Sequence, residues 1–508
     1  MAAAKEPAKG TRTTAAELRR IRPRLESPGE RFRAELLRRL DAGRTRGLSR
    51  DEAMRALFPR TVLPEETYGD VVAAIVSGAH MLFFGPSGAG KTSLAKDLWA
   101  LFPKGVWVVE GCPVLDDPLS VVDAAAADRF PPCPICTRRF APDHDPARWE
   151  PAAVDASQVP AQYVQLHEGY GYARLQGSSE VFPDHLTGNI NLRKLEEIGD
   201  PMSPLVLEPG KLLQANRGFL LVDEIGKLPL GTQNVLLQAL QEGVVTPSKS
   251  RESFPGSFVA VGTSNLSDLD NINDPLSDRL TSLHVGYNDR HADNRRIVAL
   301  ARDEGAGWVP EILTDAGVRV IEAWRLRTGD DNPDIGEVGS NRTLLDVAAR
   351  THALATLSDR TVPTSADLKA GLLHAMRGRL RARSGESFRQ NEKRVRAFID
   401  QYLPGALQRS AGVYWCRYYR DRLHESAAEA EALVGEGRRL KDDAALLAQS
   451  AGDASVFPRF RAFAGFVAER ERPGERIAPF DAAIGVYRLL EEHSLFTVRP
   501  EDDDDAPL

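Results

Sequence analysis

The most constraining feature of this sequence is an octapeptide of the type G-x-x-x-x-G-K-[ST], which runs from Gly85 to Thr92. An apolar run precedes it at 81–84 and a helical pattern follows to about residue 101, so the segment reads as strand, tight turn and helix. Glycines let such a turn curl until backbone N–H groups converge on phosphate oxygens, and the helix N-terminus adds partial positive charge. The residues expected to bind the phosphates of ATP are Gly85, Pro86, Ser87, Gly88, Ala89, Gly90, Lys91, Thr92 and Ser93.

Two adjacent carboxylates follow a second apolar run. The segment 219–222 reads as a buried strand, and it ends in Asp223 and Glu224. Beside a phosphate loop, a strand with two acids at its carboxyl end serves metal binding and activation of water. We therefore expect Thr92 and Asp223 to hold Mg²⁺, Lys91 to reach the β- and γ-phosphates, and Glu224 to orient and deprotonate the attacking water.

Three more polar residues are candidates for the same site. The buried strand 257–265 ends at Asn265, whose amide can both donate and accept between the γ-phosphate and water. Arg279 precedes the expected strand 283–285, where it is a candidate finger for a neighbouring subunit's γ-phosphate. Arg342 follows a predicted N-cap at Ser340 and can project toward the nucleotide, although an exposed arginine at a helix start is the alternative.

The cysteines gather in one stretch of the chain. Cys133 and Cys136 form a C-x-x-C pair in a proline-rich turn, which is half of a doubled zinc-knuckle signature. Cys112 is the candidate third ligand of a structural zinc ion, with His144 or a nearby carboxylate as the fourth. Three unrelated thiols are the alternative, whereas a thioredoxin-like motif fits poorly because no βαβ unit begins at this pair.

Composition and charge restrict the class of protein. The 508 residues leave room for about three domains, and 42% hydrophobic with 27% charged residues is ordinary for a soluble globular chain. No apolar run approaches the roughly 20 residues needed to span a bilayer, and no secretory signal opens the chain, so we expect a cytoplasmic protein without membrane contact. Arginines are frequent in the first forty residues, and residues 501–505 are all acidic. We interpret them as solvated helix faces and a disordered tail, and interaction arms are the alternative.

Periodicity divides the chain into four regions. Residues 1–60 read as a basic helical region, 61–290 as an α/β nucleotide-binding core, 291–385 as helices, and 386–508 as a mostly helical region with the acidic tail. Within the core, 105–109 is expected as a second buried strand because it is short, apolar and β-branched.

The order of these motifs resembles that of the AAA+ ATPases. Within that class, segments 207–224, 275–279 and 377–381 resemble the ATPase subunit of magnesium chelatase and the MoxR-like branch, and the resemblance covers about residues 60–385. It implies an α/β fold, with a three-layer parallel-sheet phosphate-loop core and an all-helical lid, flanked here by helical N- and C-terminal regions. It also implies an insert in the second core helix at about 182–205 and a hairpin at about 243–257.

The resemblance further implies how such a protein works. Arg279 would be a finger acting in trans, Arg342 a lid sensor, and the assembly a homo-hexamer with nucleotide at its subunit interfaces. The implied function is that of an ATP-hydrolysing ring machine that remodels a partner protein or loads metal or cofactor into it, with an integrin-like partner of the von Willebrand factor A type. The spacing of 132 residues from Lys91 to Asp223 (223 − 91) is long for this family and marks about 111–180 as a Cys-rich insertion.

A nucleic-acid motor of the same branch is the alternative function. It is motivated by the basic tip of the expected hairpin, Lys249 and Arg251, and by the arginine-rich N-terminus. The acidic net charge of −7 and the lack of a helix-turn-helix or aromatic stacking platform argue against it.

Overall fold

The computed structural model describes most of the chain, namely residues 7–22, 24–201, 203–247, 250, 252–303, 307–327, 339–379, 387–423, 438–443, 458–474 and 477–493. The chain forms two compact units, Met1–Gly286 and Tyr287–Leu508. The basic hairpin tip at Lys249 and Arg251 and the acidic tail at 501–505 lie outside the described residues.

The first unit is built around a six-stranded sheet in which every neighbouring pair is parallel. Its order is β13-β2-β12-β9-β6-β5. The central strands are rich in Val, Leu and Phe and almost fully buried, as expected for parallel strands that are covered on both faces. In sheet order the strands are β13 (Leu280–His284), β2 (His80–Gly85), β12 (Val259–Asn265), β9 (Phe219–Asp223), β6 (Gly171–Gln176) and β5 (His167–Glu168).

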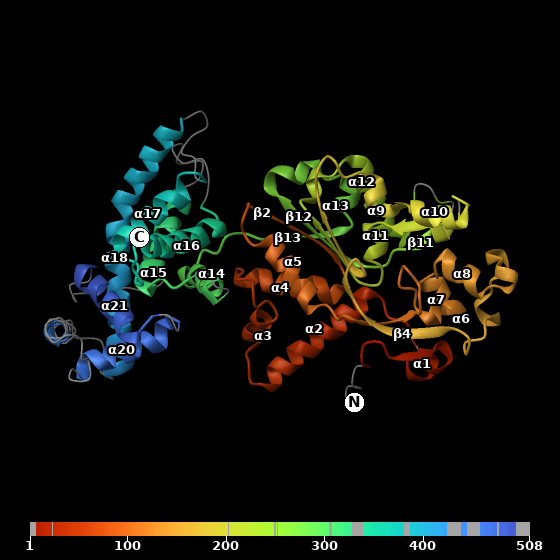
Figure 1. Ribbon diagram of the computed structural model, residues 1–508, viewed down its shortest axis with the longest axis horizontal. Helices are drawn as coiled ribbons and strands as arrows, with labels where there is room; N and C mark the ends of the chain where they lie inside the picture. Colours follow the sequence, from red (N-terminus) through yellow and green to blue (C-terminus); the bar gives the residue numbers. More distant parts are fainter. Residues whose placement is uncertain are drawn as a thin grey trace. The chain divides into compact units, whose positions relative to one another are not determined.

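Helices cover both faces of this sheet and complete the predicted three-layer α/β fold. Figure 1 shows α2, α4 and α5 on one side of the central strands and α9, α12 and α13 on the other. Their bounds are α2 (Pro28–Thr45), α4 (Glu65–Ser77), α5 (Lys91–Leu101), α9 (Pro183–Thr187), α12 (Leu230–Glu242) and α13 (Asp274–Ser277).

The strand expected at 105–109 forms, but it does not belong to the central sheet. This strand, β3 (Gly105–Val109), pairs antiparallel with β4 (Pro160–Gln165), which in turn pairs with β1 (Arg12–Thr14). The neighbour of β9 is instead β6, which lies inside the range 111–180 that the sequence marks as an insertion. The additional segment therefore ends before β6. Its strand β4 forms a small separate sheet with β3 and β1.

Two short elements expected from the family resemblance are present. Strands β7 (Gly188–Ile190) and β8 (Leu207–Pro209) pair antiparallel between α9 and α11 (Lys211–Gln214), and α10 (Leu192–Ile198) lies between them. They form the insert expected at about 182–205. The second element is the hairpin of β10 (Val244–Val245) and β11 (Phe254–Pro255) ahead of β12.

The N-terminal helices belong to the first unit. Helix α1 (Ala15–Ile21) follows β1, and α2 and α3 (Arg50–Ala56) each begin with a capping box, in which a serine and a glutamate three residues later bond each other's backbone N–H groups. Phe32 of α2 packs against Phe102 and Phe219, with ring centroids 5.3 and 6.5 Å apart. This contact anchors α2 beneath the central sheet. The segment 118–140 adds three short helices, α6 (Pro118–Val122), α7 (Ala124–Arg129) and α8 (Pro134–Phe140).

The described part of the second unit consists of helices, with a core that includes Trp324, Trp415, Phe460 and Phe463. The helices are α14 (His291–Asp303), α15 (Glu311–Arg325), α16 (Asn341–Leu357), α17 (Ser365–Met376), α18 (Phe388–Leu423), α20 (Pro458–Glu471) and α21 (Pro479–His493). None of the described helices of either unit is long and apolar enough to cross a membrane.

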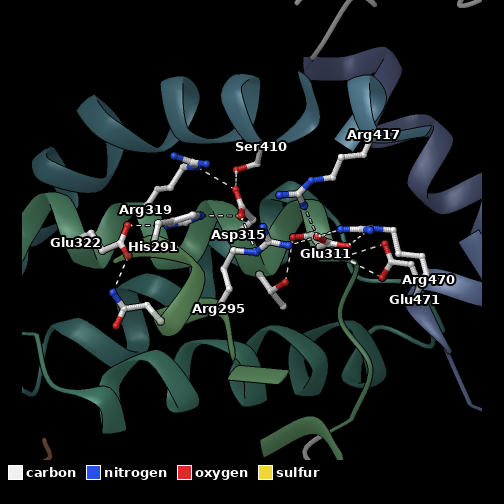
Figure 2. A network of polar contacts seen from close by, with 12 residues as sticks. His291, Arg295, Glu311, Asp315, Arg319, Glu322, Ser410, Arg417, Arg470 and Glu471 are labelled. Atoms are coloured by element: carbon white, nitrogen blue, oxygen red, sulfur yellow. Dashed lines mark hydrogen bonds and ion pairs between the residues drawn. The ribbon is translucent and has the colours of Figure 1, made fainter. Parts of the chain in front are cut away.

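A network of charged side chains joins four helices of this unit (Figure 2). Asp315 accepts from His291 at 2.8 Å and from Arg319 at 2.9 Å, and it also accepts from Ser410 on α18. Glu311 receives guanidinium groups from α14, α18 and α20, which belong to Arg295, Arg417 and Arg470. These ion pairs connect helices on both sides of residue 385, so 291–385 and the described residues after 386 pack as one unit.

Candidate nucleotide site and thiol cluster

The predicted phosphate loop lies between β2 and α5 at the carboxyl edge of the sheet. Gly85 has φ 151°, and a Cβ there would collide with the carbonyl of Val285, so only glycine fits this position. Gly90 caps α5 with φ 110° and offers no side-chain cap, and the first turn of the helix carries no acidic residue. The N–H groups of this turn are therefore suited to phosphate oxygens, which is what a bound ATP would supply. Pro86, Ser87, Gly88 and Ala89 form the turn itself, and Ser93 is exposed on α5.

Lys91 and Asn265 meet at this edge. The Lys91 Nζ donates to the carbonyls of Gly85 and Pro86 at 2.8 and 2.7 Å and to Asn265 Oδ1 at 3.1 Å. The parallel register of β2 and β12 places Asn265 directly opposite Gly85. Two residues that are 174 positions apart in sequence therefore lie in one hydrogen-bonded group.

Asp223 lies at the end of β9, next to Thr92. Its Oδ1 accepts from Thr92 Oγ1 at 2.9 Å and from Thr263 Oγ1 at 2.6 Å, and its Oδ2 pairs with Arg174 Nη2 at 2.9 Å. Burial would raise the pKa of Asp223, but the hydrogen bonds from Thr263, Arg174 and Thr92 hold it below its ordinary value. An ionised carboxylate beside a threonine hydroxyl is an oxygen pair of the kind that Mg²⁺ takes in phosphate-loop sites, so these residues fit the ion.

Glu224 follows Asp223 in the left-handed region, at φ 56°. Its N–H donates to Thr263 Oγ1 at 3.0 Å, and its carboxylate accepts from Gln176 Nε2 at 2.9 Å and from Lys227 Nζ at 3.0 Å. Gln176 of the neighbouring strand β6 and Lys227 thus hold the Glu224 carboxylate at the end of β9. It can serve as a base once Gln176 and Lys227 no longer donate to it.

Three residues of this group were not predicted from the sequence. Arg174 and Gln176 are brought in by β6, whose pairing places Gln176 opposite Asp223. Thr263 lies two residues before Asn265 on β12, so both side chains share one face of the strand. The two-residue spacing between Thr263 and Asn265 was the one feature of the sequence that could have identified Thr263 as part of the site.

The two candidate arginines are positioned differently. Arg279 is exposed in the first unit, between α13 and β13. Arg342 is exposed in the first turn of α16 in the second unit, and Ser340 is the N-cap of that helix, with its hydroxyl on Thr343 Oγ1 at 3.3 Å rather than on a backbone N–H. Among the described residues of the first unit, Arg279 forms no ion pair with the group around Asp223.

Residues 77–302 match the family model described as the PrkA AAA domain. The chain carries an AAA+ domain. It is distantly similar to magnesium chelatase ATPase subunits: it is 27% identical to the magnesium-chelatase 38 kDa subunit of Acidiphilium rubrum over 65% of this chain and 88% of that protein. It is 24% identical to a magnesium-chelatase subunit ChlI homolog of Methanocaldococcus jannaschii, over 63% of this chain and 84% of that protein. A solved magnesium chelatase complex of subunits BchI and BchD has a chain that aligns with TM-score 0.32 and 22% identity, covering 66% of this chain and 98% of that chain.

The AAA+ domain also contains the predicted thiol cluster. Cys112, Cys133 and Cys136 are buried, and their sulfur atoms lie with a carboxylate oxygen of Asp116 within 4.8 Å of one another. The Cys112 and Cys133 sulfurs are 3.8 Å apart, far beyond the about 2.05 Å of a disulfide bond. Zinc–sulfur bonds of about 2.3 Å in a tetrahedron place two sulfurs about 3.8 Å apart, so this spacing fits the edge of a tetrahedral site.

The structure corrects the fourth member of this cluster from His144 to Asp116, a nearby carboxylate. His144 is exposed, and its Nδ1 contacts the carbonyl of Arg138 at 3.4 Å. Asp116 Oδ2 accepts from the Cys133 N–H at 2.7 Å, whereas its Oδ1 is buried without a hydrogen-bond partner among the described residues. Burial and the neighbouring Cys112 raise the pKa of Asp116 to about 8. A cation among the three thiols would supply the partner that this oxygen lacks.

Proposed function

We propose that this AAA+ protein hydrolyses ATP as a ring machine that remodels a partner protein or loads metal or cofactor into it. The observation that carries the proposal is the convergence of Lys91, Thr92, Asp223 and Asn265 at the carboxyl edge of one sheet, with Glu224 beside them. These are the groups that hydrolysis of a phosphoanhydride requires.

Each residue has a separate task in the proposed reaction. The loop N–H groups and Lys91 bind the phosphates of ATP, and Thr92 with Asp223 holds the Mg²⁺, whose charge offsets the negative charge of the phosphates when it is bound. Glu224 takes a proton from the attacking water, and Asn265 orients that water against the γ-phosphate. The products are ADP and phosphate.

Assembly would complete the site. Arg279 is exposed on the first unit, where it is free to meet a neighbouring copy as the finger in trans, and Arg342 would act from the second unit as the lid sensor. We propose that the assembly is a homo-hexameric ring, as the resemblance of the sequence to magnesium chelatase ATPase subunits implies. We also propose a separate partner of the von Willebrand factor A type, which the same resemblance implies.

The activity is tested by Glu224→Gln, because the amide keeps the size of the side chain but cannot take a proton. We expect this variant to bind ATP with unchanged affinity and to lose steady-state hydrolysis by at least about a hundredfold, the scale of a lost general base. Glu242→Gln at the exposed end of α12 is the matched control and should hydrolyse ATP normally. Hydrolysis by Glu224→Gln at the rate of the control would contradict the assignment.

The client is tested by purification of the protein with its native partners. Co-purification of a metal-binding protein of the von Willebrand factor A type is the expected result. Salt-sensitive binding to single- or double-stranded DNA, without such a partner, would instead favour a nucleic-acid motor.

We further propose a structural zinc ion bound by Cys112, Asp116, Cys133 and Cys136. The support is the buried, tetrahedron-sized arrangement of three sulfurs and one carboxylate. Metal analysis of the purified chain should find about one equivalent of zinc, and less than about half an equivalent would rule the site out.

A further inference from the structure

The residue after the fourth ligand of the thiol cluster is a second buried acid. Asp117 accepts from Arg22 Nη2 at 2.8 Å through Oδ1 and at 2.6 Å through Oδ2, and it accepts from Arg217 Nη2 at 2.6 Å. Arg22 is the residue after α1. Arg217 lies just before the central strand β9, separated from it by Gly218. One carboxylate therefore joins the N-terminal segment to the core, directly beside the thiol cluster.

Asp117 also starts the helix on which α1 lies. Its Oδ1 accepts from the Leu119 N–H at 2.9 Å and so caps α6. Leu119 of α6 packs with Leu18 of α1, and at the other end of α6 the carbonyl of Val122 accepts from Arg19 at 2.6 Å. Both ends and the middle of α6 thus contact α1.

The loop that presents Asp116 and Asp117 is held by individual hydrogen bonds rather than by a helix or strand. Residues 110–117 contain neither, and their carbonyls accept from the Val109 N–H (at Asp116, 2.8 Å), from Asn216 Nδ2 (at Val114, 2.6 Å) and from Arg217 Nη1 (at Leu115, 3.4 Å). A cation held by the three cysteines and Asp116 would tie this loop to Cys133 and Cys136 at the start of α8, and would so fix Asp116 and its neighbour Asp117.

We propose that the thiol cluster acts as a metal-dependent latch for the N-terminal segment. Zinc binds Asp116, which fixes Asp117 and the start of α6, and these hold α1 and, together with the pairing of β1 with β4, residues 12–22 against the AAA+ core. The latch rests on the zinc site proposed above. It adds the consequence that loss of the metal releases residues 12–22 while the phosphate loop keeps its structure.

The latch is tested by hydrogen exchange of the full-length protein, read peptide by peptide with mass spectrometry. On removal of zinc with a chelator, we expect amide exchange to rise at least tenfold in residues 12–22 and 112–122, and to stay unchanged in β2 and α5. Cys136→Ser should give the same pattern without chelator. If that variant does not fold, the chelated wild-type chain provides the measurement by itself.

Two arginine variants separate the latch from the metal site. Arg22→Met should keep its zinc and yet show faster exchange in residues 12–22, because it loses the contact to Asp117. Arg24→Met is the matched control, since Arg24 is exposed and pairs only with Glu30 among the described residues, and it should change neither zinc content nor exchange. A zinc-loaded protein whose residues 12–22 exchange equally after chelation would overturn the latch and leave the zinc site standing. A purified chain without zinc would remove both, and neither result bears on ATP hydrolysis.

Discussion

The charged network of the second unit predicts that Glu311→Gln is strongly destabilising. The Glu311 carboxylate accepts from Arg417 Nη1 at 2.9 Å and from Arg470 at 2.5 and 2.7 Å, and it also accepts from Arg295 (Figure 2). Gln keeps the shape of the side chain but removes its charge and turns one acceptor into a donor. Three guanidinium groups would then surround a neutral amide.

The size of the effect follows from burial. The Glu311 side chain is 17% exposed, and the three arginines are 18 to 27% exposed, so these pairs lie between surface ion pairs, worth about 0–1 kcal/mol, and fully buried ones, which cost about 3–5 kcal/mol when broken. We expect a loss of about 2–4 kcal/mol in the free energy of unfolding. At about 2–4 °C per kcal/mol for a unit of this size, the thermal midpoint of the second unit should fall by at least about 4 °C.

Differential scanning calorimetry of the full-length chain, with and without ATP, measures this shift. ATP should raise the transition of the unit that carries the phosphate loop more than the other transition, which identifies the other as that of the second unit. Glu392→Gln is the matched control, because Glu392 forms an ordinary (i, i+4) pair with Arg396 on α18 and should shift the midpoint by less than about 1 °C. Equal midpoints for the two variants would refute the network as a source of stability.

Three further predictions follow from individual contacts. Gly85→Ala should abolish ATP binding in an equilibrium assay, because its Cβ would collide with the Val285 carbonyl; Gly231→Ala on α12, where a Cβ meets open space, should bind normally. Thr263→Val should weaken Mg²⁺-dependent hydrolysis about ten- to a hundredfold, since it removes hydrogen bonds to Asp223 and to the Glu224 N–H worth about 1.5–3 kcal/mol; a wild-type Mg²⁺ titration would contradict this. Burial would lower the pKa of His291, but Asp315 and Glu322 hold it above its ordinary value, so its stabilisation is complete below pH about 6.5 and is lost as the pH rises through the raised pKa. The midpoint of the second unit should fall over that range, and His291→Asn should remove this dependence.

The sequence predicted the parts of the nucleotide site that depend on local chemistry. The phosphate loop, the acids at the end of β9 and the asparagine at the end of β12 are each marked by a strand that ends in a special residue, and all three strands occur in the structure. Parallel strands bring their carboxyl ends to one edge, so the grouping followed from the fold class.

The strand β6 was missed for a physical reason. It carries Arg174 and Gln176 on one face, because that face meets Asp223 and Glu224, and these polar residues break the apolar pattern of a buried strand. The more apolar 105–109 looked like the better core strand, although its neighbours are β4 and, through β4, β1. A polar alternation beside an active edge is hard to distinguish from a surface strand in a single sequence.

The fourth member of the thiol cluster was undecided for a similar reason. The C-x-x-C pair fixes two sulfurs on one turn, but the third lies 21 residues away, across α6 and α7. Spacing alone cannot say whether a histidine eight residues after Cys136 or an acid four residues after Cys112 lies nearer to the three sulfurs. The loop that caps α6 decides between them, because it buries the side chains of both Asp116 and Asp117.

The strand β9 separates the thiol cluster from the nucleotide site. Just before the amino end of β9, Arg217 contacts Asp117, and Asp223 is the last residue of β9. Between them, β9 is paired over its length with β12 on one side and β6 on the other. The Arg217 N–H also donates to the Ser257 carbonyl at 2.6 Å, independently of Asp117. Loss of the Asp117 contact therefore leaves two ladders holding β9 in register. This is why we expect zinc removal to loosen residues 12–22 and to leave the position of Asp223 unchanged.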